Sequence, residues 1–313
     1  MPKTPISFGT DGWRAIIAED FTVSNVRLCA QGVASYLRAE GNAKAGGVIG
    51  YDTRFGSHRF AVAAAEVLAG NDVPVYLCST FAPTPAASYN LIAKKAAGAI
   101  VITASHNPPE WNGFKYKPDY GGSASPEVIE ALEVHIESAA GDSDGPPRLE
   151  LSEAIRTGRI ELFDPKPPYL AHLADLVDIE RIKFSSLRIA ADPMYGAGIG
   201  YLTELIGGDG SLQIDEIHGE PNPAFPGFSR PEPISSNLGP LRDHVLRGRL
   251  SVGLATDGDA DRVGGVDEKG RVFTPLQFFA LLAYYMLEIR KDRGALVKSV
   301  TSSSMIDRLG EIY

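Results

Sequence analysis

Three aspartates alternate with small residues in the stretch TDGDADR. In an extended loop this spacing can direct the carboxylates of Asp257, Asp259 and Asp261 toward one point. Three carboxylates at short range repel one another unless a cation lies between them. Oxygen ligands of this kind favour Mg²⁺ or Ca²⁺ over zinc. The stretch therefore predicts a site for a hard divalent metal ion.

Arg262 follows the third aspartate and can offset the surplus negative charge that three carboxylates leave around a 2+ ion. On spacing alone, a solvated turn rich in aspartate remains the alternative. An EF-hand loop is excluded, although Glu268 falls at position twelve counted from Asp257. That loop needs glycine at position six, where this sequence has Arg262, and it needs helices on both sides.

A second polar stretch, TASHNPPEWNGFK, follows the apolar run GAIVI. Ser105 can act as a nucleophile if a base lies nearby or if it already carries a phosphoryl group. His106 or Lys115 can carry a proton, and Asn112 begins an Asn-Gly pair that is typical of a tight turn. On spacing alone, a polar surface turn without chemistry stays open.

Two further patterns are weaker. FGTDGWR places Arg14 after a glycine turn, and DPMYGAG (residues 192–198) stands between a strand-like run and a helix. The second pattern fits either an anion at a helix N-terminus or a close packing turn. The remaining histidines show no ligand spacing, and we expect structural roles for His58, His135, His172, His218 and His244.

Composition limits the classes of partner. The chain has 313 residues, with 39 acidic against 30 basic side chains and a net charge of −9. It has no block of lysine and arginine, so we expect no nucleic-acid partner. The N-terminus lacks an apolar signal segment, and the longest apolar run, LQFFALLAYYMLEI, is shorter than the ~20 residues that span a membrane. We therefore expect a cytoplasmic protein with no membrane contact, in which Cys29 and Cys78 are core residues; nothing in the sequence indicates an oligomeric state.

Strand-like and helix-like segments alternate along the chain, which is typical of α/β domains with mostly parallel sheets. We expect one α/β domain over residues 1–145 with the serine stretch, a second over 146–267 with the acidic stretch, and the start of a third over 268–313. The third segment should contain one long helix, a strand at ALVKSV (295–300) and a short helix from Ser304.

The two polar stretches both follow strand-like runs. Ligands of parallel sheets collect beyond the carboxyl ends of the strands. We therefore expect ligands to collect beyond the predicted strand ends, which lie at Asp52, Ser105, Asp192, Asp257 and Thr301.

Taken in order, FGTDGWR, TASHNPPEWNGFK, DPMYGAG and TDGDADR resemble the α-D-phosphohexomutase superfamily, and the bacterial phosphoglucomutase/phosphomannomutase branch is the most similar. The resemblance runs through essentially the whole chain. It implies several α/β units with mixed sheets around a cleft. It also implies a phosphoserine enzyme that interconverts hexose 1-phosphate and hexose 6-phosphate, of glucose or mannose, through a hexose 1,6-bisphosphate.

The resemblance also implies a role for each matched residue. Ser105 carries the transferable phosphoryl group, Lys115 does acid/base work, and Arg14 and His106 contact the active site. Arg262, which pairs with the phosphate of the phosphoserine, and Asn112 are the implied substrate- or phosphate-binding residues. The implied Mg²⁺ ligands are Asp257, Asp259, Asp261 and an oxygen of Ser105 in its phosphorylated form.

The family's sugar-recognition loop and its distal phosphate-binding loop do not appear before Tyr313. We therefore expect these residues alone to take phosphate from a hexose 1,6-bisphosphate onto Ser105 but to interconvert glucose phosphates poorly. Two alternatives stay open: a non-catalytic or regulatory sugar-phosphate binder, and a magnesium-dependent phosphatase.

Overall fold

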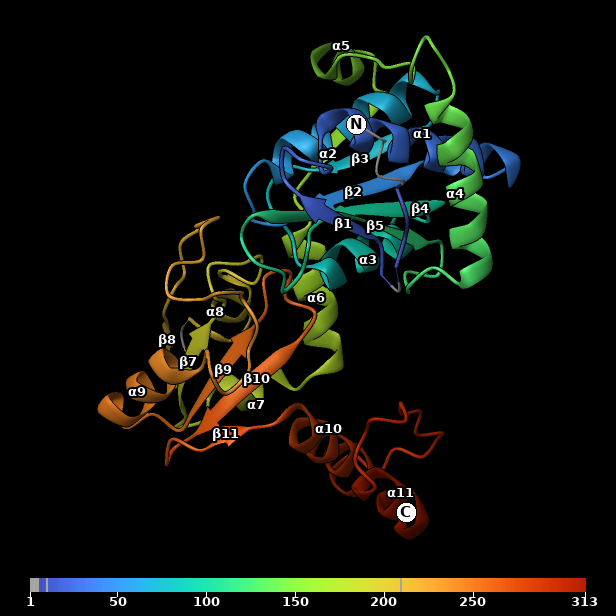
Figure 1. The fold of residues 1–313 in the computed structure, drawn as a ribbon. Helices are drawn as coiled ribbons and strands as arrows, with labels where there is room; N and C mark the ends of the chain where they lie inside the picture. The colour runs from blue at the N-terminus through green and yellow to red at the C-terminus, as the bar shows by residue number, and fades with distance from the viewer. Residues whose placement is uncertain (1–5, 10, 209) are drawn as a thin grey trace.

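Two mixed β-sheets carry the fold (Figure 1). The computed structural model describes residues 6–9, 11–208 and 210–313, so the first five residues, on which part of the expectation about a signal segment rests, lie outside it. The first sheet has the order β1-β5-β4-β2-β3-β6. Its strands are β1 (Trp13–Ile16), β2 (Gly47–Tyr51), β3 (Val75–Cys78), β4 (Gly98–Ile102), β5 (Trp111–Pro118) and β6 (Ile160–Phe163).

The centre of the first sheet is parallel. β4, β2, β3 and β6 run in one direction, while β5 is antiparallel to both of its neighbours, β1 and β4. All residues of β2 and β4 are buried, because helices cover both faces of the sheet and such strands become continuous apolar runs.

Helices lie on both faces of the first sheet (Figure 1). α1, α2 and α4 pack together over one face, and α3 packs against β2 and β4 from the other. Ser125 caps α4, since its side chain accepts a hydrogen bond from the backbone N–H of Val128. These helices are α1 (Val23–Ala39), α2 (Ser57–Gly70), α3 (Thr84–Ala93), α4 (Pro126–Ala140) and the short α5 (Leu151–Arg156), with a 3₁₀ turn at Ala43–Ala45.

The second sheet has the order β11-β10-β9-β7-β8. β9, β7 and β8 are parallel, and the hairpin β10–β11 adds two antiparallel strands at one edge. The predicted α/β fold with mixed sheets is thus confirmed. The strands are β7 (Arg188–Asp192), β8 (Gln213–Glu216), β9 (Val252–Thr256), β10 (Val263–Asp267) and β11 (Val272–Phe273), and the helices are α6 (Lys166–Leu176), α7 (Ile179–Lys183), α8 (Tyr201–Ile206) and α9 (Gly239–Gly248).

Both expected boundaries between the units move toward the C-terminus. The segment after residue 145 still belongs to the first unit, because β6 pairs in parallel with the edge strand β3. The segment after 267 still belongs to the second, because β11 completes the hairpin with β10. Thr274 then caps the next helix with a reciprocal bond to Gln277, so the third unit begins there.

The third unit is small. It contains α10 (Pro275–Tyr284), which continues as a π-helical turn over Tyr285–Ile289, and α11 (Met305–Ile312), as predicted. The strand predicted at 295–300 is absent from the described residues. A strand needs a neighbour for its backbone hydrogen bonds, and this segment has none there; Val300 is fully exposed.

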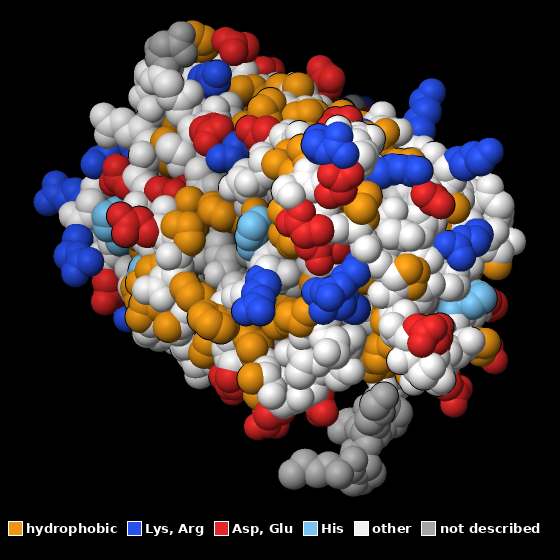
Figure 2. Space-filling view, turned by 90° about the horizontal axis from the view of Figure 1, so that it is seen from above, with side chains coloured by type: hydrophobic (Ala, Val, Ile, Leu, Met, Phe, Trp, Pro, Cys, Tyr) orange, Lys and Arg blue, Asp and Glu red, His pale blue; other side chains and the backbone are white. Residues whose placement is uncertain are grey.

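The chain runs from the first unit, where the N-terminus lies, through the second unit to α10 and α11, which project away at the other end (Figure 1). Basic and acidic side chains are interspersed over the face shown in Figure 2. Over the described residues, no helix combines the length and the apolar character that crossing a membrane requires. Cys29 and Cys78 are buried and unpaired, as expected for core residues.

Candidate active site

The two polar stretches meet at the junction of the first and second units. The serine loop (residues 103–110) follows β4, and the acidic loop (residues 257–262) follows β9. The hydroxyl of Ser105 donates a hydrogen bond of 2.9 Å to Oδ2 of Asp257. The strand ends near Ser105 and Asp257 therefore come together.

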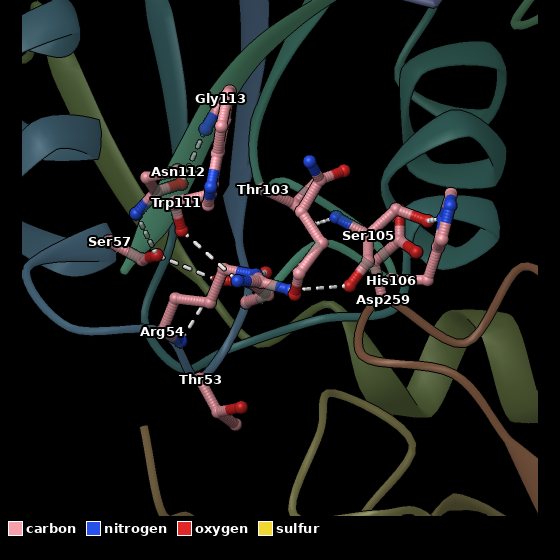
Figure 3. A network of polar contacts seen from close by, with 12 residues as sticks. Thr53, Arg54, Ser57, Thr103, Ser105, His106, Trp111, Asn112, Gly113 and Asp259 are labelled. Atoms are coloured by element: carbon pink, nitrogen blue, oxygen red, sulfur yellow. Dashed lines mark hydrogen bonds and ion pairs between the residues drawn. The ribbon is translucent and has the colours of Figure 1, made fainter. Parts of the chain in front are cut away.

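Arg54 holds the serine loop from inside the first unit (Figure 3). Its Nη2 donates to the backbone oxygens of Ser105 at 2.7 Å and Asn107 at 2.6 Å. Its Nη1 donates to the backbone oxygens of Pro108 at 2.7 Å and Trp111 at 3.0 Å. One planar guanidinium thus fixes four carbonyl groups, which a single ammonium group could not satisfy in the same geometry.

A buried network supports Arg54 in turn. The carboxylate of Asp52 lies 3.2 Å from its Nε and also accepts a hydrogen bond from the hydroxyl of Ser57 at 2.7 Å. Gly56 occupies the N-cap position of α2, and the Ser57 side chain at the first helical position faces Asp52. The ring of Phe225, from the second unit, lies 5.0 Å from the guanidinium carbon.

Asn112 belongs to this supporting network. The structure places it within β5, so the predicted tight turn at this position is not formed. Its amide donates to the hydroxyl of Ser57 at 2.9 Å and accepts from the backbone of Gly113 at 2.8 Å, and the side chain is fully buried. The Asn112 amide therefore helps to position Ser57, and its contact with a substrate phosphate stays a prediction.

Ser105 itself has an uncommon backbone conformation. Its φ of 54° lies in the left-handed region, which costs a non-glycine residue energy unless its surroundings fix it. The Arg54 contact and a hydrogen bond from the Ser105 backbone N–H to the Thr103 hydroxyl supply that fixation. In this conformation the Ser105 hydroxyl points to Asp257. Nδ1 of His106 lies 3.3 Å from the Ser105 hydroxyl oxygen.

The acidic loop gathers its carboxylates as the spacing predicts. One oxygen from each of Asp257, Asp259 and Asp261 lies within 4.8 Å of the other two. Gly258 must be glycine here, because a Cβ at that position would collide with the backbone oxygen of Ser105. Gly196 of the DPMYGAG stretch packs closely on Gly258 in the same way, which supports the packing interpretation of that stretch.

Each carboxylate has a different surrounding. Oδ1 of Asp257 accepts hydrogen bonds from the backbone N–H groups of Asp261 and Arg262, at 3.0 and 3.1 Å. Oδ2 of Asp259 accepts from the hydroxyl of Thr84 at 2.6 Å and from Lys115 at 2.8 Å. Oδ1 of Asp259 is buried without a hydrogen-bond partner among the described residues. An unpartnered carboxylate oxygen inside a three-carboxylate cluster fits a hard cation such as Mg²⁺.

Lys115 reaches this cluster from β5 of the first unit. Its ammonium lies 2.8 Å from Asp259, 2.8 Å from Asp11 and 3.3 Å from Asp261, and the side chain is 1% exposed. Burial alone would lower the pKa of Lys115, but the three carboxylates outweigh it and raise the pKa above its usual value. Lys115 is therefore held as a cation beside the predicted metal site.

Burial and neighbouring charges also shift the pKa values of the three aspartates. Burial and the charges of Asp259 and Asp261 raise the pKa of Asp257 well above its usual value. Burial would also raise the pKa of Asp259, but Lys115 overcomes this and lowers it to about 2. Burial and the charge of Asp259 raise the pKa of Asp261 despite Lys115. Lys115 thus compensates Asp259 well, whereas Asp257 and Asp261 remain short of positive charge despite the nearby Arg262.

Three predicted residues form a more open rim around Ser105. Nη1 of Arg14 donates to the side chain of Asn107 at 2.9 Å, and Nη1 of Arg262 to Glu232 at 3.0 Å. Burial lowers the pKa of the third, His106, and the charge of Arg262 lowers it further, so its ring favours the neutral form. The structure thus brings Arg14, His106 and Arg262 to the mouth of the site without a direct bond from either arginine to Ser105.

Sequence reasoning missed several residues that hold the site together. Arg54 stands in YDTRFG, directly after β2, whose carboxyl end lies beside that of β4; this position could have indicated its role. Asp11 stands within the FGTDGWR motif, where only Arg14 was singled out. Thr84 and Glu232 carry no motif signal, because they reach the acidic loop only through the packing of separate segments.

Comparison with known proteins agrees with this geometry. Residues 5–142 match the family described as phosphoglucomutase/phosphomannomutase, alpha/beta/alpha domain I, and residues 167–270 match domain II of the same family. A phosphoglucomutase of Komagataeibacter xylinus is 30% identical over 98% of this chain and 58% of its own length. A phosphoglucosamine mutase of Bdellovibrio bacteriovorus is 31% identical over 99% of this chain and 66% of its own length.

Among solved structures, a Thermus thermophilus protein assigned as a phosphomannomutase superimposes with a TM-score of 0.86 at 34% identity, over 99% of this chain and 67% of that one. The chain spans 58% of the length of the Komagataeibacter relative and 66% of the Bdellovibrio relative, so these enzymes are longer. The two domain matches cover well over half of the chain in consecutive order. The chain belongs to the phosphoglucomutase/phosphomannomutase family.

Proposed function

We propose that this protein is a phosphohexomutase that acts through a phosphoserine at Ser105. The substrates would be hexose 1-phosphate and hexose 6-phosphate, with glucose and mannose as the expected sugars, and a hexose 1,6-bisphosphate would be the intermediate. The names of the relatives support the class of reaction but differ in the sugar. We keep the cytoplasm as the expected location.

One observation carries the proposal. The Ser105 hydroxyl lies 2.9 Å from Asp257, within a cluster of three carboxylates, and the Lys115 ammonium lies in the same cluster. A nucleophile, a predicted metal site and a proton carrier therefore converge at the junction of the two units. A surface turn without chemistry would not bury a serine and a lysine to 1% exposure beside three carboxylates.

The first half of the reaction loads the serine. The Ser105 oxygen attacks a phosphorus atom of the hexose 1,6-bisphosphate, so a P–O bond to Ser105 forms as the P–O bond to the sugar breaks. The hydroxyl proton of Ser105 leaves toward Asp257 or His106, its two hydrogen-bond partners. Lys115 donates a proton to the departing sugar oxygen. Phosphoryl transfer of this kind depends mainly on alignment and charge neutralisation.

The other half runs these steps in reverse on a hexose monophosphate. Its free hydroxyl attacks the phosphorus on Ser105, so a P–O bond to the sugar forms as the P–O bond to Ser105 breaks, and hexose 1,6-bisphosphate results. Lys115 accepts the proton of the attacking hydroxyl, and the Ser105 oxygen takes its proton back from Asp257 or His106. When Ser105 next attacks the other phosphate of this bisphosphate, the isomeric monophosphate leaves. Ser105 and Lys115 are each 1% exposed, so substrate reaches them only when rim side chains such as His106, or the two units, shift. Arg54 keeps the serine loop in position during that movement.

The acidic loop would hold Mg²⁺ through Asp257, Asp259 and Asp261, with an oxygen of phosphorylated Ser105 as a further ligand. The buried, unpartnered oxygen of Asp259 supports this assignment. When bound, Mg²⁺ would withdraw charge from the transferred phosphoryl group.

Peptide mapping after exposure to a phosphoryl donor tests the proposal. The protein is incubated with glucose 1,6-bisphosphate and Mg²⁺ and digested, and phosphopeptides are located by mass spectrometry. We expect phosphate on Ser105 in the wild type and none in Ser105→Ala. Phosphate on a different serine, or no phosphate at all, would remove the basis for a phosphoserine mechanism.

A further inference from the structure

A proline-rich segment of the second unit, residues 230–233, is fixed against both polar loops. Pro231 and Pro233 are buried, and the backbone N–H of Gly258 in the acidic loop donates to the Pro231 oxygen at 3.2 Å. A Cβ added to Gly258 would meet the Pro231 ring at 3.1 Å and would also collide with the backbone oxygen of Ser105. The segment therefore lies next to the point where the two loops touch.

The extended backbone of this segment presents charged side chains between its buried prolines. With Pro231 and Pro233 directed inward, Arg230 and Glu232 are directed outward. The side-chain amide of Asn237 donates to the backbone oxygens of Arg230 at 3.0 Å and Glu232 at 2.8 Å. These bonds fix the positions from which Arg230 and Glu232 extend to the mouth of the site.

Glu232 bridges two arginines. Its Oε2 lies 3.5 Å from Nε of Arg230, and its Oε1 lies 3.0 Å from Nη1 of Arg262. The two arginine side chains are 51% and 44% exposed, whereas Glu232 is 16% exposed. Nε of Arg262 also lies 3.9 Å from Asp261, so the two arginines face two carboxylates. Both guanidinium groups nevertheless stay partly exposed and have more N–H donors than these ion pairs use.

We propose that Arg230 and Arg262 form a paired-arginine clamp that binds a phosphate group of the entering sugar phosphate. Guanidinium groups bind phosphate oxygens through two parallel hydrogen bonds, and Glu232 shows that both side chains reach one shared anion. The proposal rests on the proposed function and deepens it. It adds Arg230, which no sequence motif indicated, to the residues that bind the substrate.

A third arginine lies on the same rim, where Nη1 of Arg14 donates to the side chain of Asn107 in the serine loop at 2.9 Å. A dianionic phosphate that enters beside Ser105 would therefore meet Arg14 as well as Arg230 and Arg262.

The test measures how fast Ser105 accepts phosphate at increasing concentrations of glucose 1,6-bisphosphate, with saturating Mg²⁺, in the full chain. Arg230→Gln should raise the half-saturating concentration about tenfold, since hydrogen bonds to a charged group are lost, and leave the maximal rate within about twofold. Arg230→Lys keeps the positive charge but loses the planar guanidinium that can make two parallel hydrogen bonds. It should raise the half-saturating concentration about threefold. Arg247→Gln, which removes an exposed arginine from α9, is the matched control and should change nothing.

Two results would overturn the clamp. One is an Arg230→Gln curve that coincides with that of Arg247→Gln, which would leave the ion pairs with a purely structural role. The other is a fall in the maximal rate at an unchanged half-saturating concentration. If the wild type itself accepts no phosphate, the proposed function fails. In that case calorimetry measures the affinity of the Arg230→Gln and Arg247→Gln variants for glucose 1,6-bisphosphate. The clamp predicts weaker binding by Arg230→Gln, and equal affinities would refute it.

Discussion

The serine loop and the acidic loop touch through the bond between Ser105 and Asp257, but different forces hold them. Backbone carbonyls of the serine loop are satisfied by Arg54, whose charge is matched by Asp52 within the same unit. The acidic loop instead depends on Lys115, which is contributed by the other unit. The serine loop is thus complete within its own unit, whereas the acidic loop has more negative charge than its surroundings neutralise.

This difference indicates that the serine loop positions the nucleophile, whereas the acidic loop responds to a bound cation. A loop that is fixed by directional hydrogen bonds keeps a nucleophile in place whether or not a cation is bound. A loop that is balanced by charge changes its energy when a cation arrives, because the same carboxylates then have a better partner. Substitutions in each loop can therefore separate geometric positioning from charge compensation.

The largest effect should come from the acidic loop. Asp259→Asn should weaken Mg²⁺ binding roughly 100-fold, about 3 kcal/mol, because it removes a ligand charge. Without metal the same change should lower the free energy of unfolding by about 3 kcal/mol, since Lys115 loses its closest buried partner. Calorimetric titration and urea unfolding in EDTA measure the two effects.

Asp257→Asn is the matched variant. It should also weaken Mg²⁺ binding but should not destabilise the metal-free protein, because Asp257 has no cationic partner at bonding distance among the described residues. Equal destabilisation by both variants would contradict the assignment of Lys115 to Asp259.

The second effect concerns the serine loop. Arg54→Lys keeps the charge but cannot donate to four carbonyls in the fork geometry, so the rate of Ser105 phosphorylation should fall about 30-fold, or about 2 kcal/mol. Mg²⁺ affinity should change by less than about threefold, because the acidic loop does not depend on Arg54. The exposed Arg59→Lys on the neighbouring helix serves as control. A parallel loss of Mg²⁺ affinity would show that the two loops are not independent.

Lys115 provides the third test. In the metal-free protein the Lys115 ammonium forms an ion pair with Asp259. A metal ion that binds Asp259 must weaken this ion pair. Lys115→Met should therefore bind Mg²⁺ about tenfold more tightly at pH 8, although phosphoryl transfer is impaired. Lys117→Met, which removes a neighbouring ammonium that contacts Asp11 and not the acidic loop, should leave the affinity unchanged. Weaker binding in Lys115→Met would mean that Lys115 organises the site instead of competing for it.

The smallest effect is a pH dependence of stability. The pKa of Asp257 is raised in the folded protein, so its contribution to stability is present below its unfolded pKa and is lost as pH rises through the folded value. In EDTA the wild type should therefore lose stability relative to Asp257→Asn as pH rises from about 4, the usual pKa of an aspartate, through the neutral range. Urea unfolding of both proteins across this range measures the difference. A constant difference would show that Asp257 is charged throughout.

Much of this arrangement was predictable from local sequence. Apolar runs with polar ends indicated the strands near Ser105 and Asp257, and alternate spacing indicated the cluster of carboxylates. The resemblance of four motifs to a known family linked these two regions, although Ser105 and Asp257 are 152 residues apart in the chain. Short sequence patterns could predict these two loops because each motif lies on one loop at the end of one strand.

Other features depend on partners that lie far away in the chain. β6 joins the first sheet only because it finds the free edge of β3, and no pattern within residues 146–163 shows that edge. Asn112 looked like a turn residue, but its amide is used to hold Ser57 in the core. The role of Arg54 is equally non-local, since the carbonyls of Ser105 and Asn107 lie 51 and 53 residues further along the chain.

Transfer of phosphate from the loaded serine tests the central claim most directly. Protein labelled with radioactive phosphate on Ser105 is freed of donor and mixed with glucose 6-phosphate and Mg²⁺, and the label is followed. We predict that it passes to the sugar as glucose 1,6-bisphosphate far faster than it appears as inorganic phosphate. Label that stays on the protein would indicate a non-catalytic binder, and label released to water at the same rate with or without sugar would indicate a phosphatase; either result would contradict a mutase.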